Sequence, residues 1–96
     1  MKVKVVLTDV YREAVGGREV TEELPEGSSV KDLIDKLASR YGEVFRSIAD
    51  PDHEDWVSRD VIVLVNATIV HRLSHKLNDG DKVTIADLLE VSLGGG

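Results

Sequence analysis

The sequence SVKDLIDKLASRYG, residues 29–42, contains the strongest local signal in the chain. Ser29 is a favourable N-cap residue, and Asp32 three positions later completes a short form of the capping box. Gly42 stands where a left-handed C-cap glycine would end a helix. The apolar residues between these signals share one helical stripe: Val30, Leu33, Ile34, Leu37, Ala38 and Tyr41. We therefore predict an amphipathic helix that needs an apolar surface to cover.

The segment before this helix predicts two strands. In KVKVVL, residues 2–7, an extended chain places Val3, Val5 and Leu7 on one side and both lysines on the other, which is typical of a half-buried strand. A second extended segment follows in REVTEEL, residues 18–24. Gly16-Gly17 between them is a turn signal, so we expect an N-terminal β-hairpin with a long connection.

The segment after the helix predicts three more strands. Residues 43–60 indicate a further turn or two and then a polar excursion with a turn at Asp50-Pro51. The continuous β-branched run VIVLV, residues 61–65, favours a central strand. Asn66 begins a tight turn into the short strand TIV, residues 68–70, and KVTIAD, residues 82–87, forms the last strand.

This order of elements predicts an α+β protein. One main helix must cover the apolar face of one mixed sheet of four to five strands, because neither can bury its apolar side alone. A helix between a hairpin and later strands acts as a crossover, which makes the first and last strands parallel and central. The arrangement is that of a β-grasp, the ubiquitin-like fold. We expect a β-grasp domain over residues 1–90 and a flexible C-terminal glycine tail over residues 91–96.

The composition limits the possible function classes. A chain of 96 residues indicates one domain with one modest core. The absence of cysteine removes disulfides, thiolate metal sites and cysteine nucleophiles. A net charge of −6 argues against nucleic acid as a partner, since such affinity depends largely on lysine and arginine. We find no apolar run of membrane-spanning length and no signal peptide, so we expect no membrane association and a cytoplasmic location.

We find no catalytic or metal-binding constellation, so we expect a protein that is not itself an enzyme. His71 and His75 are four residues apart, but the segment around them does not predict a helix that would bring them to one metal. His53 lies in an acidic loop without the ligand order of a calcium site. We interpret these histidines as surface residues, and we expect Trp56 to pack the loop against the edge of the domain. Ser92 has no base that could activate it.

The end of the chain, LLEVSLGGG at residues 88–96, is the candidate functional site. Its apolar residues alternate with Glu90 and Ser92, so the segment can lie along a partner as an added strand. The glycines fit a narrow channel that excludes any Cβ atom. The group delivered is the α-carboxylate of Gly96, and the expected partner-binding residues are Leu89, Val91, Leu93, Gly94 and Gly95.

A carboxylate must be activated before it reacts. Adenylation by a partner enzyme that uses ATP would supply a leaving group, so the chain itself needs no bound cofactor. A sulfur donor then gives a thiocarboxylate, whereas a lysine amine gives an isopeptide bond. In both cases this chain is the substrate and carrier.

Four segments carry a resemblance to a known family: YREAVGG, LPEGSSVKDLIDKLASRYGEVF, VLVNATIV and LNDGDKVTI, followed by the terminal glycines. In this order they resemble the small subunit of molybdopterin synthase and the related archaeal small modifier proteins. The resemblance implies that Gly96 is adenylated by an enzyme of the ubiquitin-activating type, with Gly95 as the second glycine of the motif. It also implies conversion of Gly96 to a thiocarboxylate.

The resemblance leaves two roles open. In the first, a molybdopterin synthase large subunit is the partner, and the sulfur enters the dithiolene during molybdenum or tungsten cofactor biosynthesis. In the second, Gly96 is joined to lysines of target proteins. The segment ADLLEVSLGGG lacks the proline pair that is common in the family. The modifier role tolerates this departure more easily than docking onto a large subunit does. A third class is a non-covalent ubiquitin-like adaptor, in which the glycines are incidental.

Overall fold

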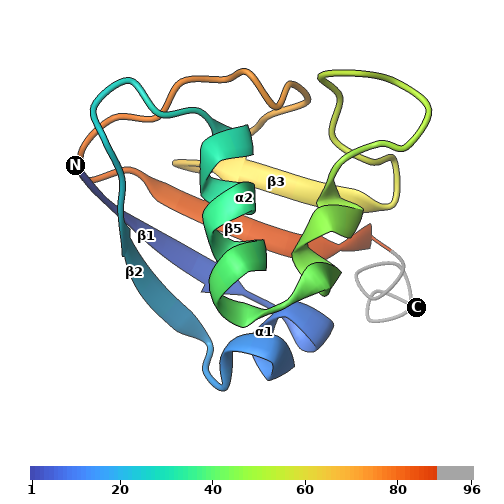
Figure 1. Ribbon diagram of the computed structural model, residues 1–96, viewed down its shortest axis with the longest axis horizontal. Helices are drawn as coiled ribbons and strands as arrows, with labels where there is room; N and C mark the ends of the chain where they lie inside the picture. The colour runs from blue at the N-terminus through green and yellow to red at the C-terminus, as the bar shows by residue number, and fades with distance from the viewer. Residues whose placement is uncertain (89–96) are drawn as a thin grey trace.

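A five-stranded sheet carrying helices on one face forms the body of the protein in the computed structural model, which describes residues 1–88 (Figure 1). The strand order is β2-β1-β5-β3-β4. The elements are β1 (Lys2–Leu7), α1 (Asp9–Val15), β2 (Glu19–Glu23), α2 (Val30–Tyr41), the 3-10 helix η1 (Glu43–Ile48), β3 (Val61–Val65), β4 (Thr68–Ile69) and β5 (Lys82–Asp87).

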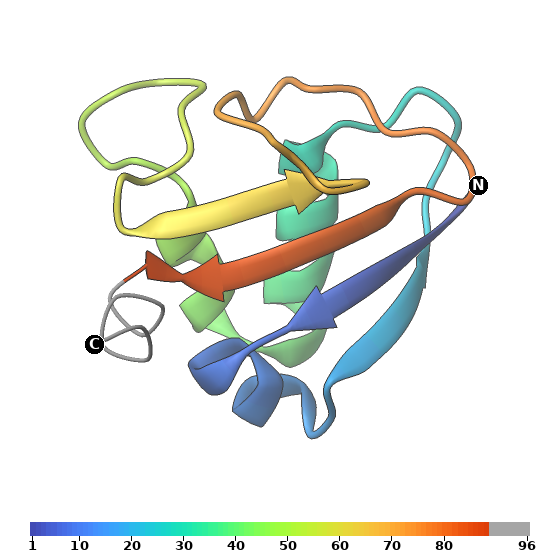
Figure 2. The same cartoon turned by 180° about the vertical axis from the view of Figure 1, so that it is seen from behind.

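The pairing of the strands confirms the predicted β-grasp. β1 and β5 are parallel neighbours in the middle of the sheet, with Val5 opposite Val83. β2 lies antiparallel to β1, and β3 lies antiparallel to both β5 and β4. The helices cover one face, and the view from behind shows the strands with no helix in front of them (Figure 2). The sheet is therefore mixed and covered on one side, as predicted.

Helix α2 begins at the predicted capping box. The Ser29 N–H donates to Asp32 Oδ2 at 2.8 Å, and the Asp32 N–H donates to Ser29 Oγ at 3.3 Å. Gly42 does end the helix, but its backbone has φ 131° and ψ 165° rather than the left-handed helical conformation expected. This extended geometry at positive φ suits glycine and directs the chain at once into η1.

The core lies between α2 and the sheet. Tyr41, at the end of the predicted stripe, is only half-buried. The other residues of the stripe are buried, as predicted: Val30, Leu33, Ile34, Leu37 and Ala38. They pack with alternate residues of the central strands: Val3, Val5, Leu7, Val63, Val65, Val83 and Ile85. The apolar residues that repeat every 3.6 positions on the helix and every second position on the strands therefore form one apolar cluster.

Helix α1 was not predicted. The connection between the first two strands contains this seven-residue helix, which ends at Gly16 in the left-handed conformation with φ 81°. The ring of Tyr11 is buried and lies 5.5 Å, between centroids, from the ring of Phe45 in η1. Burial raises the pKa of Tyr11 above its ordinary value of 10.0. A helix this short depends on such tertiary packing rather than on its own sequence.

Candidate functional site

The predicted site residues lie outside the described part of the chain. Residues 89–96, named here the terminal segment, include Leu89, Val91, Leu93, Gly94, Gly95 and Gly96, and also the predicted domain boundary between residues 90 and 91. The structure describes where this segment starts and which surface surrounds its start. Both follow from the position of β5 in the sheet.

The terminal segment starts from the middle of the sheet. β5 pairs with β1 on one side as far as Ile85 and with β3 on the other side as far as Asp87, which lies opposite Val61. The N–H of Leu88, the last described residue, then donates to the carbonyl oxygen of Asp60 at 2.9 Å. The starting point of the terminal segment is therefore held on the β3 side of β5. The eight residues of the terminal segment can span at most about 26–29 Å when fully extended.

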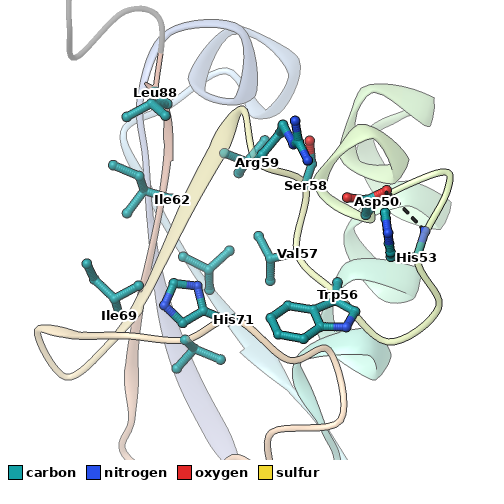
Figure 3. Close-up of a pocket in the computed structure, with 13 residues that line it drawn as sticks. Asp50, His53, Trp56, Val57, Ser58, Arg59, Ile62, Ile69, His71 and Leu88 are labelled. Atoms are coloured by element: carbon teal, nitrogen blue, oxygen red, sulfur yellow. Dashed lines mark hydrogen bonds and ion pairs between the residues drawn. The ribbon is translucent and has the colours of Figure 1, made fainter.

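A groove of about 550 Å³ lies beside this starting point, between β3 and residues 50–59 (Figure 3). We call it the β3 groove. Ile62 and Ile69 lie along one side, Trp56 and Val57 lie on the other, and Leu88 lies at one end. Three of these side chains are large, apolar and exposed: Ile69 is 55% exposed, Trp56 39% and Leu88 38%. The groove therefore offers apolar surface that the described residues leave uncovered.

Cationic and titratable side chains surround the β3 groove. Arg59 is exposed and forms no ion pair within 4.0 Å among residues 1–88. His53 Nδ1 lies 3.5 Å from Asp50 Oδ1, and His71 lines the groove from the segment after β4. The N–H of Asp52 donates to Asp50 Oδ1 at 2.8 Å, and this bond lowers the pKa of Asp50. The surroundings therefore combine the guanidinium of Arg59, which has no ion pair within residues 1–88, with the side chains of His53 and His71.

The histidines and Trp56 lie as the sequence indicated. His53, His71 and His75 are exposed, as predicted for surface residues. Trp56 packs at the edge of the domain, where the guanidinium carbon of Arg72 lies 4.0 Å from its ring centroid. Trp56 and Arg72 also form an isolated β-bridge. These contacts hold the loop before β3 against the segment that follows β4.

The β3 groove was missed by the sequence analysis. Its residues come from the loop before β3, from β3 and β4, and from the end of β5, so they share no local pattern. One signal in the sequence could have indicated the groove: two isoleucines each stand next to a residue that faces the core. Ile62 precedes the buried Val63, and Ile69 precedes the buried Val70. Alternation of this kind places large apolar side chains on the uncovered side of the sheet.

The parallel central strands, the crossover helix and the mixed sheet define a β-grasp protein of the ubiquitin-like class. Within that class, the ThiS family model matches residues 5–86. The chain belongs to the ThiS family, whose members are ubiquitin-like sulfur carriers.

Solved structures of related proteins agree with this assignment. The putative molybdopterin converting factor, subunit 1, from Pyrococcus furiosus is 34% identical, with a TM-score of 0.69 over 91% of this chain and 97% of that one. A chain of the BexX/CysO complex from Amycolatopsis orientalis is 26% identical, with a TM-score of 0.71 over 88% and 93%. SAMP1 from Haloferax volcanii shares the fold at 19% identity, with a TM-score of 0.72 over 91% and 94%.

No curated protein sequence matches the chain. Among residues 1–88, no helix combines the length and the apolar character that a membrane span requires.

Proposed function

We propose that this protein is the sulfur carrier of molybdopterin synthesis, the small subunit that delivers sulfur for a molybdenum or tungsten cofactor. The observation that supports this proposal most strongly is the likeness to the Pyrococcus furiosus molybdopterin converting factor, subunit 1, which extends over 91% of the chain. The membership of the ThiS family supports the same general chemistry. The reactive group is the α-carboxylate of Gly96.

The proposed reaction begins with a partner enzyme of the ubiquitin-activating type. One carboxylate oxygen of Gly96 attacks the α-phosphorus of ATP, pyrophosphate leaves, and an acyl adenylate forms. A sulfur nucleophile at the oxidation level of hydrosulfide then attacks the carbonyl carbon. The bond from this carbon to the AMP oxygen breaks, AMP leaves, and loss of the sulfur-bound proton gives the thiocarboxylate. If a persulfide supplies the sulfur, a thiol reductant cleaves its S–S bond.

In this proposal the chain presents its carboxylate and the partner enzyme performs the catalysis. β5 is paired with β1 and β3, and the N–H of Leu88 is bound by the carbonyl oxygen of Asp60, so the terminal segment that carries the carboxylate is attached to an ordered strand of the sheet. Glycine at the end removes every Cβ that would obstruct a narrow channel in the partner. The alternating Leu89, Val91 and Leu93 provide contacts that offset the backbone entropy of ordering, about 1–2 kcal/mol per residue.

The proposed partners are an adenylating enzyme and a molybdopterin synthase large subunit. The solved BexX/CysO complex contains a chain of this fold at 26% identity, which supports a role in assembly with another protein. The acidic character of the chain, net charge −6, suits partners with a basic surface.

Conjugation to proteins is a second candidate function. A lysine amine that attacks the same activated carbonyl of Gly96 releases AMP, or an intermediate thiol, and leaves an isopeptide bond. The observation that favours it is the terminal sequence ADLLEVSLGGG, which has no proline to stiffen the approach to a dedicated large subunit.

Intact-mass measurement separates the two functions. The protein is incubated with ATP, a sulfide source and extract of its own organism, and the C-terminal peptide is then analysed. A sulfur carrier gains the mass difference between sulfur and oxygen at Gly96. A modifier instead gives extract proteins with a lysine-linked C-terminal peptide. An unmodified carboxylate with unmodified extract proteins contradicts both.

A further inference from the structure

We propose that the terminal segment, residues 89–96, docks into the β3 groove of its own chain, which serves as its resting site between encounters with partner enzymes. The proposed occupant is this segment rather than a second protein. Position, reach, apolar surface and charge each favour it.

The position of Leu88 is the first argument. Leu88 lines the groove, and its N–H is held by the carbonyl oxygen of Asp60, so the terminal segment begins at one end of the groove. Figure 3 shows Leu88 at that end, Ile62 next to it, and Ile69 farther along. The terminal segment begins at the groove itself, and its eight residues have a contour length of about 26–29 Å. The segment can therefore return along the groove after a turn near Leu88.

The distribution of apolar surface is the second argument. Among residues 1–88, the large hydrophobic side chains that remain exposed are Val10, Trp56, Ile69 and Leu88, and three of these line the β3 groove. The terminal segment supplies Leu89, Val91 and Leu93 at alternate positions. Fully burying one such side chain contributes about 1.5–3 kcal/mol. Because ordering each backbone residue costs about 1–2 kcal/mol, docking of residues 89–93 is close to balanced.

The glycines place a limit on the docked length. Gly94, Gly95 and Gly96 have no side chain to bury and lose more backbone entropy than other residues when ordered. The docked portion therefore ends at Leu93. A docking free energy close to zero suits a resting site, because a partner enzyme needs only a modest binding free energy to displace the segment from the groove.

Charge is the third argument. Glu90 is the acidic side chain of the terminal segment, and the C-terminal carboxylate adds a second negative charge. Arg59 at the groove is unpaired within the described residues, and His53 and His71 lie on the same groove. Arg59 and Leu88 lie toward the same end of the groove (Figure 3), and Glu90 is only two residues beyond Leu88 in the sequence, so docking would bring these opposite charges within reach of each other.

Covalent connection favours the chain's own segment over that of a second copy. A short linker gives an effective concentration in the millimolar range, about 1 mM or above. Two separate molecules at micromolar concentration cannot compete with this. If the proposed function holds, docking also slows adenylation, because the activating enzyme must first release the segment.

Trp56 gives a direct test, because it is the only tryptophan in the sequence and lines the groove. Acrylamide quenching of Trp56 fluorescence is measured in the full chain, in the double variant Val91→Ser/Leu93→Ser, and in Ser92→Ala as the matched control. Docking predicts stronger quenching and a red-shifted emission in the double variant, and unchanged values in the control. The amide NMR signals of Ile62 and Ile69 should shift in the double variant alone.

Three results would overturn the proposal. Equal quenching in the full chain and the double variant means that residues 91 and 93 do not cover Trp56. An equal change in Ser92→Ala means that the effect is not specific to the apolar positions. Protection that increases with protein concentration means that a second copy supplies the segment. Since no activating enzyme or ATP takes part, these results are independent of the proposed sulfur-carrier function.

Discussion

Oε2 of Glu22 lies 2.6 Å from Nη1 of Arg40, and the side chain of Glu22 has no exposed surface. The pair connects β2 to α2 across the edge of the core. Lys36 lies 3.9 Å from the same oxygen and also donates to the carbonyl oxygen of Glu23. The other carboxylate oxygen, Oε1, has no hydrogen-bond partner among the described residues. Glu22 therefore depends strongly on Arg40.

Replacing Arg40 should destabilise the fold. Arg40→Met keeps an apolar stem but leaves a buried carboxylate without its closest cation, so we expect a loss of about 2 kcal/mol in the free energy of unfolding. Arg46→Met is the matched control, because Arg46 pairs only with partly exposed or exposed Asp35 and Glu43 within residues 1–88. The control should lose less than about 1 kcal/mol. Urea unfolding compares the two, and equal losses would contradict a special role for Arg40.

The N-cap of α2 offers a second test. Ser29 accepts the N–H of Asp32, so Ser29→Ala leaves that donor without its partner and should reduce the free energy of unfolding by about 1 kcal/mol. Ser39→Ala on the exposed side of the same helix is the control and should change stability little. If thermal unfolding shows no difference between the two variants, the capping box does not stabilise the helix.

The capping box also predicts a pH dependence. The Ser29 N–H bond lowers the pKa of Asp32 below its ordinary value of 3.8. Because the folded-state pKa is below the unfolded-state pKa, ionised Asp32 stabilises the fold above pH 3.8, and this contribution is lost as the pH falls through the folded-state pKa. Asp32→Asn should be less stable than the unmodified protein at pH 7, and the difference should shrink below pH 3.8. A constant difference would contradict the assignment.

A substitution in the turn between β3 and β4 should stabilise the protein. Asn66 has φ 50° and Ala67 has φ 71°, which are left-handed conformations at both central positions. Asn-Gly is the preferred pair for a hairpin turn of this kind, whereas alanine is strained there. Ala67→Gly should raise the free energy of unfolding by about 0.5–1 kcal/mol, since relief of strain exceeds the added freedom of the unfolded chain. A lower melting temperature in this variant would contradict the strain.

Most of the fold was predictable because its elements carry strong local periodicity. The stripe of α2 and the alternation of Val3, Val5 and Leu7 each indicated which side faces the core, and the crossover rule then gave parallel central strands. Helix α1 was not predictable in the same way. Its stability comes from contacts such as Tyr11 with Phe45, which lie 34 positions apart in the sequence and leave no local pattern.

The reactive site at the end of the chain stays a prediction. The reactivity of Gly96 was inferred from the glycine run and from resemblance, and neither depends on the folded core. The β3 groove could not be predicted, because Trp56, Ile69 and Leu88 meet only through the pairing of β3 with β4 and β5. Sequence periodicity identifies which residues are buried, but it does not identify which exposed residues are neighbours.

Mass spectrometry of the C-terminal peptide tests the central claim most directly. The protein and its Gly96→Ala variant are each incubated with ATP, a sulfide source and the activating enzyme purified from the same organism. We predict that the carboxylate of Gly96 exchanges one oxygen for sulfur in the unmodified protein and that the variant remains unchanged. An unmodified Gly96 carboxylate, or sulfur incorporated equally in the variant, would contradict the account.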